Sequence, residues 1–329
     1  MKKILENLFQ HQTLSREEAK KILGEISEGK FNASEVSSFL TVFRMRSITV
    51  EELSGFRDSM RERCISIDLN EFNPVDLCGT GGDGKDTFNI STLASFVTAG
   101  AGIKVAKHGN YGVSSSCGSS NVMEYLGYQF TNDPSTLKQQ IDKNSICFLH
   151  APHFHPSMKN VAPIRRDMGI KTFFNMLGPM VNPASPKNQM VGVYSLELQR
   201  YYKYIYEKED ISYRIIHNMD GYDEISLTAA TKVVTPDQEY MFQPQEVTHK
   251  KIKPEDLYGG KTVKESAEIF IQILNGDGSH AQNKAVIANA AMAIQAASPK
   301  KSMQDCLHMA TESLESKKAH LALKTLLAS

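Results

Sequence analysis

The stretch LCGTGGDGKDTFNIST, residues 77–92, decides the fold because it combines the end of a strand, a glycine-rich turn and the start of a helix. Its glycines at 79, 81 and 84 fit G-x-G-x-x-G, which is typical of dinucleotide-binding loops. Gly79, Gly84 and Lys85 also fit most of the P-loop pattern G-x-x-x-x-G-K-[ST]. Both patterns hold an anion at the amino end of a helix, so the stretch indicates an α/β fold with an anion site.

Neither of the two patterns fits in full. A dinucleotide site needs an acidic residue about 20 residues after the glycines, and Lys107 and His108 stand in that region. The P-loop needs a hydroxyl residue directly after its lysine, whereas Asp86 follows Lys85 and Thr87 comes one place late. A third kind of phosphate loop therefore remains open beside the two familiar ones.

A glycine turn without any ligand is the plain alternative. Against it, the short polar side chains of Asn89, Ser91 and Thr92 follow at the start of the next helix. Backbone N–H groups at that helix end attract an anion, and the glycines allow the backbone to approach it closely. We therefore expect this loop to bind an anion.

Strand-like and helix-like segments alternate on both sides of the loop. Strands are expected at residues 75–79, 103–109, 145–151, 189–195, 212–218 and 231–236. Helices are expected at residues 91–102, 119–129, 133–144, 265–276, 283–297 and 302–328. Such alternation predicts a mainly parallel central sheet flanked by helices, with ligands at the carboxyl ends of its strands.

The first 70 residues contain helical patterns only. Ser15 with Glu18, and Thr49 with Glu52, have the spacing of capping boxes. A further helical stretch, residues 158–183, interrupts the alternation of strands and helices. The sequence therefore predicts a small all-helical N-terminal domain, residues 1–70, joined by a returning helical segment near 157–176, and a larger α/β domain, residues 71–329.

Composition argues against several classes of partner. Lysines and arginines number 37, as do aspartates and glutamates, so no net charge draws the chain to nucleic acid or to a membrane. The sequence has no apolar run of roughly 18 residues and no signal peptide pattern at its start. Its five cysteines are scattered and form no C-x-x-C pair, which argues for free thiols. We expect a cytoplasmic protein without nucleic-acid or membrane partners.

A second strand-loop-helix unit follows the first. Lys107 and His108 end a predicted strand, and small hydrogen-bonding side chains follow at positions 114, 115, 116, 119 and 120. A serine-rich loop alone is usually only solvated. Two such anion loops in succession, however, suit a ligand with two separated phosphate groups better than the tail of a single nucleotide.

A pair of adjacent carboxylates, Asp223 and Glu224, lies farther along the chain. Asp220 and Gly221 form a turn before them, and strand-like residues bound the segment. Most acidic pairs are solvated surface. Mg²⁺, however, is commonly held by one or two carboxylates together with substrate phosphates, so a diphosphate ligand and this pair would explain each other.

With these motifs assembled, the chain closely resembles the anthranilate phosphoribosyltransferase family. The resemblance covers nearly the whole chain. It rests on GTGGDG, NIST, KHGN, VSSSCGSS, HPSMKNVAPIRRDMGIKTFFNMLGPMVNP, DGYDE and NAAMAI, in that order. It implies transfer of the 5-phosphoribosyl group from phosphoribosyl diphosphate (PRPP) to the amine of anthranilate in tryptophan biosynthesis. It also implies a helical domain hinged to an α/β domain, a homodimer formed through the helical domains, and Mg²⁺, as two ions bound with PRPP.

The resemblance further implies the site residues. PRPP would be bound by Gly79, Gly82, Asp83, Thr87, Asn89, Ile90, Ser91, Thr92, Lys107, His108, Gly109, Asn110, Ser114, Ser115 and Ser119. Anthranilate would contact Gly79, Asn110 and Arg165, and Mg²⁺ would be held by Ser91, Asp223 and Glu224. No general base is assigned, because an aromatic amine is already neutral at pH 7, although His108 is a candidate for a late proton transfer.

Some positions depart from the family pattern. Tyr111 and Gly112 stand where Arg followed by Ser or Ala is usual, Ser116 and Cys117 where Lys or Arg and then Ser is common, and Asn121 where Asp is usual. The loss of two basic residues weakens the expected phosphate affinity of the second loop. These departures also leave open the possibility that the acceptor is a related aromatic amine. The same fold would also accommodate a pyrimidine nucleoside phosphorylase or a relative that binds nucleic acid.

Overall fold

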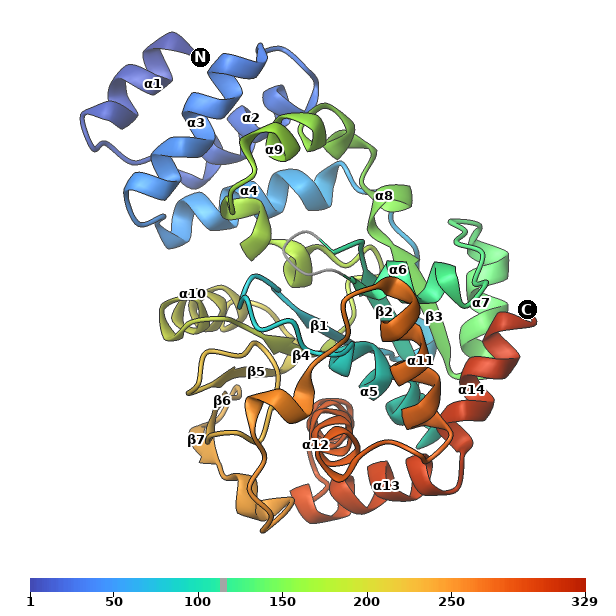
Figure 1. Cartoon of the computed structure of the whole chain (residues 1–329). Helices are drawn as coiled ribbons and strands as arrows, with labels where there is room; N and C mark the ends of the chain where they lie inside the picture. The colour runs from blue at the N-terminus through green and yellow to red at the C-terminus, as the bar shows by residue number, and fades with distance from the viewer. Residues whose placement is uncertain (113–116) are drawn as a thin grey trace. The chain divides into compact units, whose positions relative to one another are not determined.

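The structure is a computed structural model, and it describes residues 1–112 and 117–329. The contacts between Cα atoms divide it into two compact units. A helical unit consists of residues 1–66 and 152–183, and an α/β unit consists of residues 67–151 and 184–329 (Figure 1). The chain therefore leaves the α/β unit after residue 151 and returns to it at residue 184.

The helical unit is built from short amphipathic helices. They are α1 (Lys2–Phe9), α2 (Arg16–Ser27), α3 (Ala33–Met45), α4 (Val50–Glu62), α8 (Ala151–Phe154) and α9 (Ala162–Met168), with 3₁₀ turns at Pro156–Asn160, Phe173–Met176 and Gly178–Val181. Helices α2, α3 and α4 each begin with a reciprocal capping box, led by Ser15, Asn32 and Thr49. Each N-cap stabilises its helix by about 1 kcal/mol, which defines where these helices start.

An aromatic cluster joins the two segments of the helical unit. Phe39, Phe43 and Phe56 come from α3 and α4, and Phe173 comes from the returning segment. The rings of Phe56 and Phe173 stack with their centroids 4.2 Å apart, while Phe43 meets Phe173 edge-on at 5.3 Å. Phe39, Phe56 and Phe173 are buried, so residues 152–183 complete the core of this unit.

The α/β unit contains one sheet, which has seven strands within the described residues. The strands are β1 (Val75–Gly79), β2 (Val105–Gly109), β3 (Ile146–His150), β4 (Asn188–Gly192), β5 (Ser212–Asn218), β6 (Thr231–Val234) and β7 (Glu239–Phe242), in the spatial order β3-β2-β1-β4-β5-β6-β7. In this spatial order the first five strands pair in parallel, and β6 and β7 add an antiparallel edge. The predicted fold class is confirmed, while the sequence analysis missed strand β7.

Helices cover the sheet. They are α5 (Ile90–Gly100), α6 (Ser119–Tyr125), α7 (Pro134–Asn144), α10 (Leu196–Tyr206), α11 (Val263–Leu274), α12 (His280–Ala297), α13 (Met303–Glu315) and α14 (Lys318–Leu327). Shorter 3₁₀ turns lie at Asn70–Phe72, Pro244–Glu246 and Pro254–Leu257. No helix in the described part of the chain is both long enough and apolar enough to cross a membrane.

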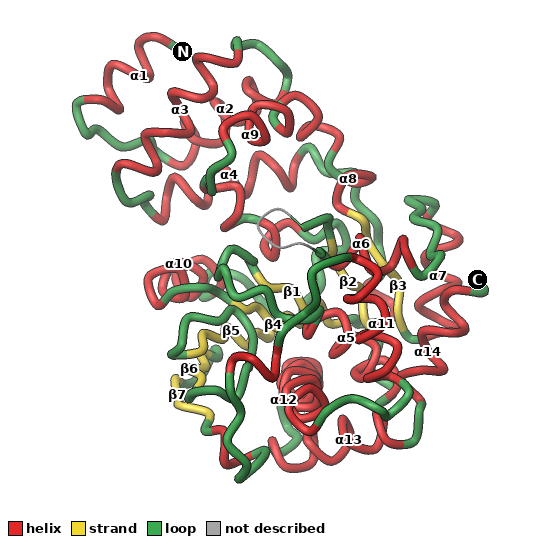
Figure 2. The backbone as a smooth tube through the Cα atoms, in the orientation of Figure 1, coloured by secondary structure: helices red, strands yellow, loops and turns green. Residues whose placement is uncertain are grey.

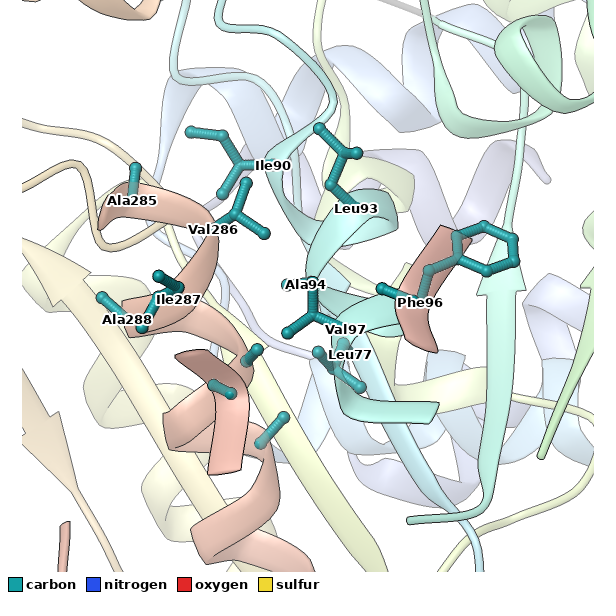
Figure 3. Packing of buried hydrophobic residues seen from close by; sticks show 14 of the residues in the cluster. Leu77, Ile90, Leu93, Ala94, Phe96, Val97, Ala285, Val286, Ile287 and Ala288 are labelled. Carbon is teal, nitrogen blue, oxygen red and sulfur yellow. The ribbon is translucent and has the colours of Figure 1, made fainter. Parts of the chain in front are cut away.

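The core of the α/β unit centres on the packing of α5 and α12 against the sheet. Leu93 and Val97 of α5 and Val286 of α12 belong to one buried cluster with Leu77 of β1 (Figure 3). The run of alanines on α12, among them Ala285 and Ala288, leaves room for close approach of the helices. This packing fixes the amino end of α5 beside the carboxyl end of β1.

We predict that Leu93→Ala lowers the free energy of unfolding by about 2–5 kcal/mol, because a fully buried leucine is replaced by a cavity. The matched control is Leu321→Ala on α14, where the side chain is 57 % exposed and the cost should stay below about 0.5 kcal/mol. Urea denaturation followed by far-UV circular dichroism measures both. Equal shifts of the two midpoints would contradict the assignment of Leu93 to the core.

Candidate functional site

The glycine loop, residues 80–89, connects β1 to α5 without regular structure (Figure 2). Gly81, Gly82 and Gly84 have φ values of +63°, +79° and +72°. Nothing in the described structure would crowd a Cβ at Gly81 or Gly84. Glycine is therefore favoured there by the left-handed backbone and not by a lack of space.

The carboxylate pair lies against this loop, although more than 130 residues separate the two in sequence. The backbone N–H of Gly81 donates to Asp223 Oδ2 at 2.7 Å. The backbone N–H of Ser91, in the first turn of α5, donates to Glu224 Oε1 at 2.9 Å. The Thr87 hydroxyl donates to Glu224 Oε2 at 3.3 Å. Asp223 is thereby fixed on the glycine loop, and Glu224 is fixed at the amino end of α5, where the helix dipole favours negative charge.

Two glycines on neighbouring strands make room for Asp223. A Cβ at Gly79 would lie 2.4 Å from Asp223 Oδ2, and a Cβ at Gly192 would lie 1.5 Å from the Asp223 carbonyl oxygen. The two glycines are direct partners in the parallel pairing of β1 with β4. The sequence analysis missed Gly192, and the only available signal was a glycine in the middle of the strand predicted at residues 189–195.

Asn289 fixes the backbone directly after the carboxylate pair. This buried residue of α12 accepts the Ile225 N–H at 3.0 Å and donates its amide to the Ile225 carbonyl at 3.0 Å. It also donates to the Ala285 carbonyl at 2.8 Å. The sequence analysis assigned no role to Asn289, although a single polar residue within the apolar stretch 285–294 is an informative signal.

The electrostatics of the pair call for a cation. Burial raises the pKa of the Asp223 carboxyl well above its usual range, and the negative charges of Asp83 and Glu224 raise it further. Burial likewise raises the pKa of Glu224 to about 7, although the Ser91 N–H and the charge of Lys107 oppose that shift. A bound cation would offset the cost of holding both groups ionised.

The fit of a metal rests on these two carboxylates. Within the described residues, no three His, Cys, Asp or Glu side chains converge as metal ligands. A divalent cation held here would therefore need further oxygen ligands from a bound substrate, which is the usual arrangement for Mg²⁺. Asp83 lies nearby in the glycine loop, where its Oδ1 accepts the Lys85 N–H at 3.1 Å.

Strand β2 places Lys107, His108 and Gly109 beside the glycine loop. The Lys107 ammonium group is buried and donates to the Leu77 carbonyl of β1. The buried His108 donates its backbone N–H to Asp76 Oδ1 at 3.1 Å. These contacts anchor Lys107 and His108 within the sheet. The next polar groups along the chain lie in the loop after Gly109.

The second loop closes on itself around Asn110. Ser119 Oγ accepts the Asn110 N–H at 3.2 Å, and the Ser120 N–H donates to the Asn110 carbonyl at 3.1 Å. Asn89, the N-cap residue of α5, donates its side-chain amide to the Cys117 carbonyl at 3.1 Å. The two loops are therefore joined directly. The predicted residues Ser114 and Ser115 lie outside the described residues.

The residues that depart from the family pattern hold the second loop together. Asn121 Oδ1 accepts the N–H groups of Gly112 and Gly118, each at 2.9 Å. The Tyr111 hydroxyl donates to Glu124 at 3.1 Å, and its ring meets that of His150 edge-on at 4.9 Å. Tyr111 thus contributes packing and a hydrogen bond where a basic side chain is usual in the family.

Arg165 belongs to the helical unit, in the last turn of α9. Its guanidinium carbon lies 5.0 Å from the centre of the Phe174 ring, and Nη2 donates to Asn175 Oδ1 at 3.4 Å. It forms no ion pair with Asp167 or with any other acid of the described chain. Burial lowers the pKa of the guanidinium. Arg165 therefore keeps the capacity to bind a carboxylate through two parallel hydrogen bonds.

Comparisons with known proteins agree with this geometry. Residues 71–320 match the family described as "Glycosyl transferase family, a/b domain", and residues 2–64 match "Glycosyl transferase family, helical bundle domain". An anthranilate phosphoribosyltransferase of Flavobacterium johnsoniae is 59 % identical over 99 % of this chain and 98 % of its own length. One of Bacteroides thetaiotaomicron is 49 % identical, with 98 % of each chain covered.

Solved structures give the same result. The anthranilate phosphoribosyltransferase of Thermus thermophilus superposes with a TM-score of 0.88 at 31 % identity, covering 98 % of both chains. The Saccharomyces cerevisiae enzyme, solved in complex with PRPP and Mg, gives a TM-score of 0.90 at 26 % identity, covering 98 % of this chain and 96 % of that one. From its sequence, its two units and the arrangement of its loops, this chain belongs to the anthranilate phosphoribosyltransferase family.

Proposed function

We propose that this chain transfers the 5-phosphoribosyl group from PRPP to the amine of anthranilate, releasing diphosphate, in tryptophan biosynthesis. The observation that carries the proposal is the carboxylate pair hydrogen-bonded to the glycine loop and to the first turn of α5. The yeast relative has been solved in complex with PRPP and Mg and in complex with 4-fluoroanthranilate. These complexes support the choice of the two substrates.

PRPP would bind across the two joined loops. Its diphosphate would face the backbone N–H groups of the glycine loop and the amino end of α5. The remaining contacts would come from the end of β2 and from the second loop. The proposed residues are Gly79, Gly82, Asp83, Thr87, Asn89, Ile90, Ser91, Thr92, Lys107, His108, Gly109, Asn110 and Ser119, together with Ser114 and Ser115 outside the described residues.

Asp223 and Glu224, with Ser91, would hold Mg²⁺, as two ions bound together with PRPP. A cation fits these residues because burial and repulsion from neighbouring carboxylates raise the pKa of each carboxyl. A bound cation would offset both effects and favour the ionised carboxylates. When bound, Mg²⁺ would neutralise charge on the diphosphate and make it a better leaving group. The N–H groups of Gly81 and Ser91 keep both carboxylates oriented for this task.

The chain's own groups would assist the reaction mainly by position and charge. Cleavage of the C1–O bond of PRPP builds negative charge on the diphosphate, which backbone N–H groups of the glycine loop would stabilise. The aromatic amine of anthranilate is already neutral at pH 7, so no strong general base is needed. His108, buried in β2, is a candidate for a late proton transfer. Arg165 would grip the anthranilate carboxylate, with Gly79 and Asn110 near the same substrate.

Several wider proposals accompany this function. We propose that the domains are residues 1–70, with the returning segment near 157–176, and residues 71–329. We also propose a homodimer formed through the helical domain, where Phe9 and Met45 are 61 % and 83 % exposed. A cytoplasmic location is supported by five cysteines that all remain free thiols.

The direct test mixes purified protein with PRPP, Mg²⁺ and anthranilate and follows the loss of anthranilate fluorescence. We expect turnover that requires all three components. Turnover with another aromatic amine but not with anthranilate would overturn the acceptor assignment. Phosphorolysis of thymidine without Mg²⁺ would favour a nucleoside phosphorylase instead.

Arg165→Ala should raise the KM for anthranilate at least about tenfold while changing the KM for PRPP far less, because a charged hydrogen-bonding group contributes roughly 1.5–3 kcal/mol. Arg166→Ala, which removes an exposed neighbour on the same helix, is the matched control and should change neither value appreciably. Initial-rate kinetics with each substrate varied in turn provide the measurement. Equal effects of Arg165→Ala on the two KM values would argue against its role.

Asp223→Asn and Glu224→Gln should each lower kcat/KM by about 100-fold or more, because charge compensation of the leaving group is lost. The Mg²⁺ concentration required for half-maximal rate should rise in both variants. Asp220→Asn, at an exposed turn in the same segment, should behave like the unaltered protein. A Glu224→Gln variant with normal rate and normal Mg²⁺ dependence would remove this residue from the metal site.

A further inference from the structure

A cavity lies in the α/β unit, at the amino end of β5 and apart from the candidate site. Its volume is about 580 Å³, which is within the range of small-molecule sites. It is lined by the start of β5, the turn between β6 and β7, the last turns of α12 and the start of α13. The glycine loop and the second loop follow the carboxyl ends of β1 and β2. The cavity contains none of the residues proposed for PRPP, anthranilate or Mg²⁺.

Arg214 of β5 supplies a buried positive charge to this cavity. Its side chain is only slightly exposed, with a residue exposure of 7 %. The guanidinium donates to the Tyr213 carbonyl at 2.9 Å, to Gln295 Oε1 at 3.3 Å and to the Gln295 carbonyl at 3.5 Å. These are neutral acceptors, and Arg214 makes no ion pair with any carboxylate among the residues that the structure describes.

A purely structural role accounts for only part of this arrangement. Through Gln295, Arg214 caps the carboxyl end of α12, where the helix dipole favours a cation. A guanidinium has five N–H donors, however, and the three acceptors leave two of them available. Burial lowers the pKa of Arg214, and the negative charge of Asp237 opposes this only in part. An anionic group in the cavity would complete the environment of the guanidinium.

The other charges of the lining restrict what that group can belong to. Arg214 is the only Lys, Arg or His that lines the cavity, whereas Asp210, Asp237 and Glu246 line it as acids and are exposed. A simple anion would meet three negative charges on its way to one positive charge. A zwitterion matches both kinds of charge in the lining, because its carboxylate can lie on the buried guanidinium while its ammonium group faces the acids.

The remaining lining is suited to an apolar side chain. Phe242 is buried, Tyr240 and Met303 are partly buried, and all three line the cavity with Pro236 and Pro299. We propose that this cavity binds a small α-amino acid with an aliphatic or aromatic side chain, whose carboxylate is held by Arg214. The ammonium group is held by Asp237 and the neighbouring acids, and the side chain packs on Tyr240 and Phe242.

Isothermal titration calorimetry with L-leucine, L-methionine and L-phenylalanine tests the proposal. The protein is first saturated with PRPP and Mg²⁺, so that the proposed PRPP site is filled. We expect saturable binding of at least one of the three amino acids. For the amino acid that binds, the matched acid without the amine and the matched amine without the acid should each bind at least about tenfold more weakly. For L-phenylalanine these are 3-phenylpropanoate and 2-phenylethylamine.

Variants locate the binding. Arg214→Gln should abolish amino-acid binding. Asp237→Asn, at an exposed turn, should weaken this binding at least about tenfold. The Asp237 variant should leave turnover of PRPP and anthranilate unchanged. Glu315→Gln, an exposed acid at the end of α13 outside the cavity, is the control and should bind normally. Arg165→Ala should also bind normally, since it alters the anthranilate site only.

The proposal is overturned if none of the three amino acids binds up to its solubility limit. It is also overturned if the acid lacking the amine binds as tightly as its parent, or if Asp237→Asn leaves binding unchanged. Loss of binding in Arg165→Ala but not in Asp237→Asn would place the ligand in the anthranilate site. That result would refute amino-acid binding in the cavity around Arg214. Because these measurements record binding and not turnover, they stand apart from the test of the proposed activity.

Discussion

The site depends on two carboxylates, one held by a backbone N–H group of the glycine loop and the other by a backbone N–H group in the first turn of α5. Gly81 and Ser91 donate to Asp223 and Glu224 at 2.7 and 2.9 Å, which ties a distant segment to the glycine loop. Ionising both groups in this buried place is costly, since only the helix dipole and a few donors offset the cost. The surrounding residues make room for the pair and fix its backbone: the glycines at 79 and 192 leave space for Asp223, and the amide of Asn289 holds Ile225.

The fold and the family were accessible from sequence because they rest on local patterns. Capping boxes at Ser15 and Thr49 and the alternation from residue 75 onward are signals that a few neighbouring residues carry by themselves. The four-residue strand β7 escaped because its pattern is short and only one of its residues, Phe242, is buried at the edge of the sheet. A strand of that kind is defined by its partner β6 and not by its own composition.

The geometry of the candidate site was harder to predict from the sequence. Sequence placed Asp223 and Glu224 near a turn, but their hydrogen bonds to Gly81 and Ser91 arise only when β4 pairs with both β1 and β5. Gly192 is needed because its Cβ would collide with the backbone of Asp223, a contact between segments about 30 residues apart. Such requirements belong to tertiary packing, and no periodicity or motif expresses them. The same holds for the cavity around Arg214, where residues from β5, the β6–β7 turn, α12 and α13 converge.

The discontinuous helical unit has a consequence for synthesis. Phe173, which stacks on Phe56, follows the α/β strands β1 to β3 along the chain. The first 66 residues therefore leave the ribosome without part of their core, and residues up to 183 must follow before that core is complete. At about 5–20 residues per second this delay lasts roughly 6–23 s. During that interval the apolar face around Phe39 and Phe56 is exposed to chaperones or to aggregation, so the nascent chain is most vulnerable before its middle has emerged.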